Sequence, residues 1–343
     1  MKKLLNTLFI TSENAYLSLD GETVLVEIDR KKVGQFPLHT LEGIISFSYN
    51  GATPAFMGAC AKRGINLSFY NPFGKFLCCV VGENQGNVLL RKKQYRISDD
   101  KDASCKIANC MILGKVFNSR WSVDRTLRDH TFRVDEERCK NATRYLTNAM
   151  LKIKNMEDLD SLRGIEGECA AIYFGVFDEL ILNQKDVFHF EGRNKRPPLD
   201  RVNAMLSFGY TLLVNDCASA LEGVGLDSYV GFLHRDRPGR KSLACDLMEE
   251  LRTVLVDRLV LTLINNRQIR KEHFQISGSG AVEFTDEGRK KFLSAWQERK
   301  REQITHPYLQ EKICWGLVPY VQALLLARYL RGDLDGYPPF LWK

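Results

Sequence analysis

Residues 107–129 read IANCMILGKVFNSRWSVDRTLRD, and the pattern of this stretch decides the fold class of most of the chain. Its apolar side chains recur about every 3.6 residues, which is the period of a helix with one buried face. The same period returns at residues 136–155, 159–182, 198–225, 242–264, 285–302 and 308–332. These successive segments predict a helical domain. One β-hairpin, with Gly278-Ser279-Gly280 at its tip, is expected between two of the helices.

The residues before 96 follow a different pattern. Short β-prone runs such as AYLSL at 15–19 and TVLVEI at 23–28 predict strands, and Asp20-Gly21 between them is typical of a hairpin turn. Residues 53–64 have the apolar spacing of a short helix. The expected fold class is therefore α+β with two domains. A small N-terminal β-sheet module with one short helix occupies residues 1–95, and a larger all-α C-terminal domain occupies residues 96–343.

The composition limits the environment of the chain. Its 343 residues carry 49 Lys and Arg against 42 Asp and Glu, and the net charge of +7 permits nucleic-acid binding without establishing it. The ten cysteines form no C-x-x-C pair and mostly stand in apolar runs, which is typical of free thiols in a reducing compartment. No run approaches the roughly 20 apolar residues of a membrane-spanning helix. We expect a cytoplasmic protein that does not enter a membrane.

Residues 231–252, GFLHRDRPGRKSLACDLMEELR, bring an imidazole, several cations and three carboxylates into one short stretch. Glu249 and Glu250 follow Asp246 by three and four positions, so all three acids would share one face of a helix. Such a face is often only a solvated surface. His234 stands at the edge of the preceding loop, where it could turn back over the acidic face.

Glu166 lies between Gly164 and Gly167, just before a strongly apolar run. A buried carboxylate without a partner is costly in free energy. Glu166 is therefore expected to stay in water at the end of its helix, to pair with Arg163, or to bind a cation.

One imidazole together with two or three carboxylates is a ligand set for a divalent ion. Carboxylate ligands suit Mg²⁺ or Mn²⁺, and the single imidazole favours Mn²⁺. Zn²⁺ sites usually contain more His or Cys. A bound ion would neutralise the acids and bridge them to a phosphate that the neighbouring Arg residues also hold.

Two loops that precede helices are rich in Arg: EGRNKRPPLDR at 191–201 and HRDRPGRK at 234–241. Arg outnumbers Lys in both, which favours forked contacts to phosphate over a merely solvated surface. Loops that only confer solubility remain the alternative. The candidate DNA-binding residues are Arg193, Arg196, Arg235, Arg237, Arg240 and Lys241.

Four motifs occur in a fixed order along the helical region. They are GIEGECAAIYF at 164–174, FEGRNKRPPLDRVNAMLSFGYTLL at 190–213, GFLH at 231–234 and SLACDLMEELR at 242–252. In this combination the chain resembles the CRISPR-associated integrases of spacer acquisition, the Cas-one family, over essentially its whole length. The resemblance implies that Glu166, His234 and Glu249 are the catalytic metal ligands, with Asp246 as a supporting acid or alternate ligand. Spacing and charge leave Glu250 open as a replacement for Glu249.

The resemblance also implies an activity. It is a metal-dependent DNA endonuclease and integrase, in which the 3′-hydroxyl of a captured fragment attacks a backbone phosphate of a CRISPR repeat array. The implied assembly is a homodimer joined through the N-terminal modules, with a dimer of the Cas-two family bridging two such homodimers. Two other functions are compatible with the residues: a metal-dependent hydrolase of small phosphates and a non-catalytic nucleic-acid scaffold. The number of cations around His234 argues against a small substrate.

Overall fold

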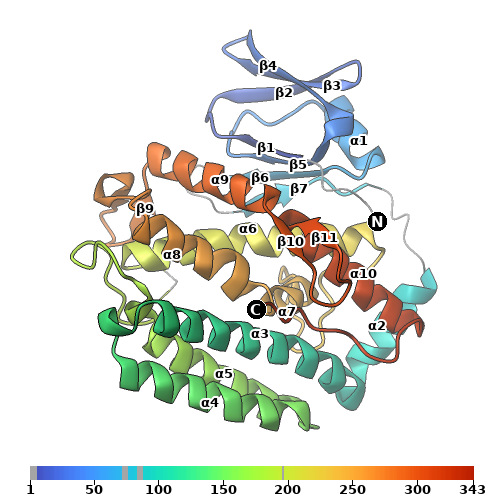
Figure 1. Ribbon diagram of the computed structural model, residues 1–343. Helices are drawn as coiled ribbons and strands as arrows, with labels where there is room; N and C mark the ends of the chain where they lie inside the picture. The colour runs from blue at the N-terminus through green and yellow to red at the C-terminus, as the bar shows by residue number, and fades with distance from the viewer. Residues whose placement is uncertain (1–5, 72–75, 83–87, 195–196) are drawn as a thin grey trace. The chain divides into compact units, whose positions relative to one another are not determined.

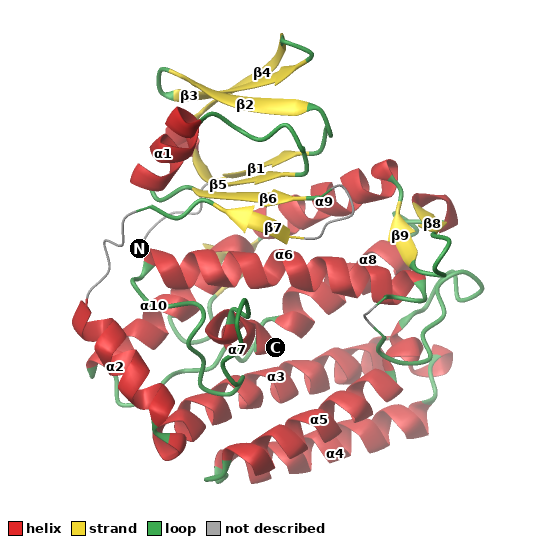
Figure 2. Cartoon of the chain, turned by 180° about the vertical axis from the view of Figure 1, so that it is seen from behind, coloured by secondary structure: helices red, strands yellow, loops and turns green. Residues whose placement is uncertain are grey.

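The chain divides into two compact units, Met1–Gln85 and Gly86–Lys343 (Figure 1). The computed structural model describes residues 6–71, 76–82, 88–194 and 197–343. The first unit is rich in strands and the second consists mostly of helices (Figure 2), so the expected α+β class is confirmed.

The division lies before the boundary that we expected after residue 95, which falls inside helix α2 (Val88–Asp99). The buried side chain of Gln94 donates to the carbonyl oxygens of Asp227 and Val230, at 2.8 Å each. These bonds fix α2 to the second unit. A polar anchor of this kind is invisible in a pattern of apolar residues, which is why the sequence placed the change about ten residues late.

The described residues of the smaller unit form two sheets and an α-helix. One sheet has the strand order β1-β5-β6-β7, in which β6 and β7 are antiparallel and the other neighbours parallel, and the second is the antiparallel meander β2-β3-β4. The strands are β1 Asn6–Ile10, β2 Ala15–Asp20, β3 Thr23–Ile28, β4 Lys31–Pro37, β5 Leu41–Ser46, β6 Asn66–Tyr70 and β7 Phe76–Cys79. Leu17, Val24 and Phe56 are fully buried in the apolar core of this unit.

Local signals in the first unit are confirmed. Strands β2 and β3 remain paired up to Asp20, and Gly21 has a φ of +56°, which glycine adopts without the strain that a side chain would add. Helix α1 (Pro54–Lys62) is capped by Thr53, whose hydroxyl accepts a hydrogen bond from the backbone N–H of Phe56 at 3.2 Å.

The larger unit is built from helices α2–α10. Three of them, α3, α4 and α5, lie side by side in both views (Figure 1 and Figure 2), around an apolar cluster that includes Ile112, Leu146 and Leu162. The helices after α2 are α3 Lys101–Asp129, α4 Glu136–Lys154, α5 Leu159–Gly175, α6 Arg201–Gly223, α7 Ser242–Glu249, α8 Arg258–Asn265, α9 Asp286–Arg301 and α10 Val318–Arg331.

Residues 242–264 do not form the single helix that their periodicity predicted. Helix α7 ends at Glu249, and the π-helical segment η4 (Arg252–Asp257) connects it to α8. A π-helical insertion changes the direction of the side chains that follow it, and such insertions are frequent at functional sites. Here the interruption directly follows the pair Glu249 and Glu250, which lie in different environments.

Two short hairpins complete the larger unit. The expected one pairs β8 (Phe274–Ile276) with β9 (Val282–Phe284), so that prediction is confirmed. The other pairs β10 (Gln303–Thr305) with β11 (Lys312–Cys314), in a region that we expected to be only helical and loop. Within the described part of the chain, the helices are too short or too polar to cross a membrane.

Candidate active site

Two of the predicted ligands meet at a lysine. Glu166 lies on α5, Glu249 is the last residue of α7, and Lys115 lies on α3. The Nζ atom of Lys115 is 2.7 Å from Oε2 of Glu249 and also contacts Oε1 of Glu166. The side chain of Lys115 is only 9% exposed and that of Glu249 only 5%. Three helices therefore bring two carboxylates to one buried cationic atom.

Glu249 is held as an anion. Arg252 donates to both of its carboxylate oxygens, at 3.0 and 3.1 Å. Burial alone would raise the pKa of Glu249, but Arg252, Lys115 and His234 outweigh burial and hold that pKa well below its usual range. The guanidinium of Arg252 also lies 4.3 Å from the centre of the Tyr210 ring, which fixes its position.

His234 is oriented by Asp246. The buried Asp246 accepts hydrogen bonds on Oδ1 from the backbone N–H of His234 at 3.0 Å and from the ring at Nδ1 at 2.5 Å. Its Oδ2 accepts from the backbone N–H groups of Phe232 and Leu233, at 2.6 and 3.0 Å. This network assigns the proton of the neutral ring to Nδ1 and leaves Nε2 as the acceptor. We call these six residues, Lys115, Glu166, His234, Asp246, Glu249 and Arg252, the Lys115 cluster.

The backbone before His234 is shaped to reach Asp246. A Cβ atom on Gly231 would lie 2.8 Å from Oδ2 of Asp246 and 2.9 Å from Ser242, so a larger residue would push the loop away. Arg163 donates to the carbonyl oxygen of Leu233 at 3.0 and 2.7 Å and thereby ties α5 to the same loop. The pairing of Glu166 with Arg163, one of our alternatives, does not form, because Lys115 takes that place.

Glu250 points away from the Lys115 cluster. Its carboxylate accepts from the Tyr337 hydroxyl, from the backbone N–H of Phe340 at 2.7 Å, and from Gln322 at 3.0 Å. Burial raises the pKa of Glu250 to about 7. Glu249 and Glu250 are neighbours in sequence, yet the partners of Glu249 lie on α3 and at the start of η4, whereas those of Glu250 lie on α10 and in the segment after it.

Lys115 and Arg252 are the residues of the cluster that our sequence reasoning missed. Arg252 ends the motif SLACDLMEELR, three residues after Glu249. Lys115 stands alone in the apolar run ILGKVF at 112–117. A lone cation on the buried face of a helix requires an acid partner, and this signal could have pointed to the site.

The predicted DNA-binding residues fall into two groups. Arg193 is inside the fold, where it donates to Oδ1 of Asn203 at 2.5 Å and to Oγ of Ser207 at 3.0 Å, and burial lowers its pKa. Lys241 donates to Oδ1 of Asn215 at 3.0 Å. Both therefore hold the protein together in this structure.

The remaining basic residues lie mainly at the surface. Arg235 and Arg237 are exposed, Arg240 is partly exposed, and Arg235 contacts Asp160 at 3.0 Å. Arg196 lies outside the described residues. The loop after His234 thus presents most of its cations to solvent, next to the Lys115 cluster.

The residues of the cluster suit a divalent ion in their chemistry. Among the described residues, no three His, Cys, Asp or Glu side chains stand close enough to hold one ion as they are. However, Glu166 and Glu249 already converge on one positive charge, and His234 lies close enough to Glu249 that its protonated ring would lower the Glu249 pKa. Two carboxylates and one imidazole are ligands for Mg²⁺ or Mn²⁺. The ammonium of Lys115 stands between the two carboxylates that such an ion would share.

Comparisons with known proteins agree with the motifs. Residues 8–298 match the family model described as CRISPR associated protein Cas1. A relative from Chlorobaculum tepidum, named CRISPR-associated endonuclease Cas1 1, is 49% identical over 343 residues, which cover 100% of both chains. A solved casposase bound to integration product has a TM-score of 0.84 at 23% identity, covering 99% of this chain and 95% of that one. A Cas6-RT-Cas1–Cas2 complex has a TM-score of 0.82 at 22% identity, covering 100% of this chain and 36% of that one.

Proposed function

The chain belongs to the Cas1 family of CRISPR-associated proteins, as its sequence motifs predicted, and we propose that it is a metal-dependent DNA endonuclease and integrase. The reaction would insert short DNA fragments into a CRISPR repeat array as part of antiviral defence. Two similar proteins support this assignment by their names: the relative from C. tepidum is called an endonuclease, and the solved casposase is bound to an integration product.

One observation carries the proposal. Glu166 and Glu249 come from two helices and converge on a single buried cation, Lys115, beside an oriented imidazole. Carboxylates are usually kept apart unless a cation joins them, because like charges repel at short distance. A surface that only bound DNA would gain nothing from two converging carboxylates, since they repel phosphate.

Glu166, Glu249 and Nε2 of His234 would hold the Mg²⁺ or Mn²⁺ ion. A bound ion of this kind polarises a phosphate and stabilises charge that develops on its oxygens. We assign Asp246 the positioning of His234 in place of a ligand role, because both of its oxygens already accept hydrogen bonds from the loop. We assign Glu250 no role at the site, because its partners lie elsewhere.

The other residues of the cluster prepare these ligands. Asp246 keeps the ring proton of His234 on Nδ1, so that the lone pair on Nε2 is available. Arg252 fixes both oxygens of Glu249 and keeps its carboxylate ionised. Lys115 holds Glu166 and Glu249 together before an ion enters, which limits the reorganisation that binding requires.

The proposed reaction is a transesterification. The 3′-hydroxyl oxygen of the incoming fragment bonds to a phosphorus atom of the repeat and gives up its proton. The bond between that phosphorus and the 3′-oxygen of the repeat strand breaks, and the leaving oxygen takes up a proton. One phosphodiester bond replaces another, so neither a protein nucleophile nor an energy source is needed.

The surface cations would hold the DNA. Arg235, Arg237 and Arg240 are the candidates for phosphate contacts, because they lie in the exposed loop that begins at His234. We further propose a homodimer joined through the strand-rich first unit, and a dimer of the Cas2 partner that bridges two homodimers. The name of the solved Cas6-RT-Cas1–Cas2 complex supports the choice of partner.

Strand transfer into a plasmid tests the function. A supercoiled plasmid carrying a repeat array is incubated with a short duplex, the Cas2 partner and Mn²⁺, and the relaxed, joined product is measured. We expect Glu166→Ala to reduce strand transfer at least about 10³-fold, because it removes a ligand beside the reacting phosphate. The matched control is Glu168→Ala on the same helix, whose side chain is exposed and contacts Tyr145. Unreduced transfer by Glu166→Ala would exclude the metal assignment.

A further inference from the structure

A second cavity in the helical unit lies apart from the Lys115 cluster. It has a volume of about 580 Å³ and lies between the C-terminal half of α3, helix α8, the segment 180–183 and residues 342–343. Neither Lys115 nor any of its acid partners lines it. Trp342 is held there because its backbone N–H donates to Oδ1 of Asn118 at 3.0 Å. A volume of this size is within the range of ligand pockets, about 300–1,000 Å³.

Arg258 has an unusual position in the wall of this cavity. Its guanidinium lies 4.4 Å from the centre of the Trp342 ring. Among the residues that the structure describes, no carboxylate lies within 4.0 Å of this guanidinium, and no described side chain or carbonyl accepts a hydrogen bond from it. Burial, together with the nearby cations Arg125 and Arg299, lowers the pKa of Arg258 to about 10, and the more distant Glu302 offsets this effect only in part. A partly buried cation without an ion-pair partner is unfavourable, so an anionic ligand would stabilise this arginine.

The rim of the cavity is also positive. Arg125 and Arg128 share one carboxylate, Asp129, at 3.5 and 3.0 Å, and Arg133 donates to the carbonyl oxygen of Leu182. Among the described residues that line the cavity, four guanidiniums thus face this single acidic side chain. We call this set, Arg125, Arg128, Arg133 and Arg258 with Trp121 and Trp342, the Arg258 cavity.

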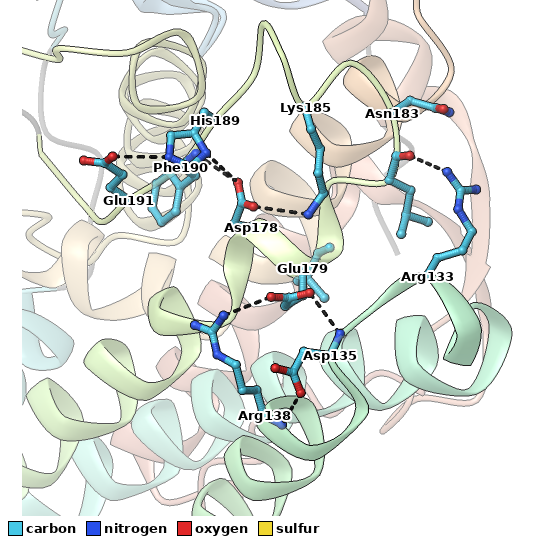
Figure 3. Close-up of polar contacts among 12 residues, drawn as sticks. Arg133, Asp135, Arg138, Asp178, Glu179, Asn183, Lys185, His189, Phe190 and Glu191 are labelled. Carbon is cyan, nitrogen blue, oxygen red and sulfur yellow. Dashed lines mark hydrogen bonds and ion pairs between the residues drawn. The ribbon is translucent and has the colours of Figure 1, made fainter.

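The acids on the neighbouring surface are already paired, as Figure 3 shows. Glu179 contacts Arg138 at 3.0 Å and the backbone N–H of Asp135 at 3.0 Å. Asp178 contacts Lys185 at 3.2 Å and lies 3.7 Å from His189 (Figure 3). These carboxylates are therefore engaged by cations that do not line the cavity.

The walls of the Arg258 cavity include aromatic rings. Trp121 and Trp342 both line it, and Trp342 packs edge-on against Trp315 with ring centroids 4.9 Å apart. Tryptophan faces and planar guanidiniums are surfaces on which nucleotide bases stack. A partly buried guanidinium beside them is suited to a phosphate oxygen, because a charge-assisted fork is stronger than a neutral hydrogen bond.

We propose that the Arg258 cavity binds a nucleotide, with its phosphate on Arg258 and the rim arginines and its base against the tryptophan walls. The base must be unpaired, because a duplex about 20 Å across does not fit such a cavity. A free mononucleotide and the unpaired end of a DNA strand share this chemistry. The proposal does not depend on the function proposed for the Lys115 cluster, because no ligand candidate of that cluster lines the cavity.

Calorimetry with small probes tests the proposal. The full-length protein is titrated in EDTA with the 5′-phosphorylated thymidine dinucleotide, with thymidine monophosphate and with inorganic phosphate. We expect Arg258→Gln to weaken dinucleotide binding at least about tenfold, because it removes a charged phosphate contact. The matched control is Arg301→Gln, which removes the same charge from an exposed position at the end of α9 and should leave the affinity unchanged.

The outcomes separate the sources of the ligand. Tighter binding of the dinucleotide than of the mononucleotide supports a strand end, and equal binding supports a free nucleotide. The proposal is overturned if neither nucleotide binds, if Arg258→Gln binds as well as the unaltered protein, or if inorganic phosphate binds as tightly as both nucleotides. Should Arg258→Gln fail to unfold cooperatively, the exposed Arg128→Ala takes its place in the titration. It should weaken binding about threefold, and unchanged affinity would overturn the proposal.

Discussion

The Lys115 cluster and the Arg258 cavity lie at the two ends of one interrupted helix, and their charges are balanced in opposite ways. Glu249 ends α7 and Arg258 begins α8, with the π-helical η4 between them. In the cluster, converging carboxylates have cations of the protein beside them. In the cavity, Arg258 has no carboxylate partner among the described residues.

This difference would suit the two regions to ligands of opposite charge. A site with an internal counter-ion is stable when empty, and its ligand must displace or accommodate that counter-ion. A site without one holds an unfavourable charge until a ligand arrives. Removing the central cation should therefore destabilise the cluster strongly and change the stability of the cavity region little.

Replacing Lys115 provides the largest test of the comparison. We expect Lys115→Met to lower the free energy of unfolding by about 3 kcal/mol without metal, because a buried ion pair loses one partner and leaves Glu166 and Glu249 to repel each other. Because Mn²⁺ would then supply the missing charge, it should stabilise this variant more than the unaltered protein. Thermal and denaturant unfolding with and without Mn²⁺ measure both effects. Equal stabilisation by Mn²⁺ in both proteins would argue against a shared position for the ammonium and the ion.

Arg258→Gln is the contrast for this measurement. It also removes a partly buried cation from the same interrupted helix, but one with no acid partner among the described residues. We expect the free energy of unfolding to change by less than about 1 kcal/mol, since the lost contact with Trp342 is offset by relief of an unpaired charge. A loss of unfolding free energy as large as that of Lys115→Met would mean that Arg258, like Lys115, is stabilised by an acid partner.

Much of the fold followed from the sequence, because the signals were local. The helical period of residues 107–129 and the Asp20-Gly21 turn depend only on neighbouring residues, and both are confirmed. Within the candidate site, the sequence singled out Glu166, His234 and Glu249, two of which the structure brings to Lys115.

The remaining features depend on partners that are distant in sequence. Periodicity places Glu249 and Glu250 on one helix face, but in the structure Glu249 contacts Lys115 and Glu250 contacts Tyr337. The break after them was missed for the same reason, since residues 242–264 are apolar enough to read as one helix. Arg193 was predicted to hold DNA, and nothing local distinguishes that role from its hydrogen bonds to Asn203 and Ser207.

Asp246→Asn tests whether the cluster is built around an oriented imidazole. Asp246 contacts no ion in our proposal, yet it fixes the ring of His234 and its protonation. We expect Mn²⁺ affinity to fall about 10–100-fold, which is typical when the residue that orients a metal ligand is lost. Electron paramagnetic resonance of free Mn²⁺ measures this affinity, at temperatures well below the unfolding of the variant. Arg258→Gln should leave the Mn²⁺ affinity unchanged. An equal loss of Mn²⁺ affinity in both variants would mean that the two regions act as one metal site.

A further test concerns the buried polar network around His306. His306 is fully buried, accepts from the backbone N–H of Leu309 on Nδ1 at 3.2 Å, and contacts Oε1 of Gln322 through Nε2 at 3.2 Å. Gln322 in turn donates to Glu250 and Tyr337. Burial lowers the pKa of His306 to about 4, and a proton on Nδ1 would also face the N–H of Leu309.

Acid should therefore destabilise the fold through His306. Between a pH of about 6.5 and about 4, this histidine is protonated in the unfolded chain but remains neutral in the folded protein. At pH 5 this amounts to about 2 kcal/mol. Glu250, whose pKa burial raises to about 7, acts in the opposite direction: its contribution is present at low pH and is lost as pH rises through 7. The two offset each other in the unaltered protein.

Comparing the free energy of unfolding of the unaltered protein with that of His306→Gln isolates the histidine, because Glu250 is common to both. The difference between the two should shift by about 2 kcal/mol in favour of the variant between pH 7 and pH 5, since glutamine takes up no proton in either state. Denaturant unfolding at the two pH values measures this shift. If this difference in unfolding free energy is the same at both pH values, His306 does not contribute to the acid sensitivity of the fold.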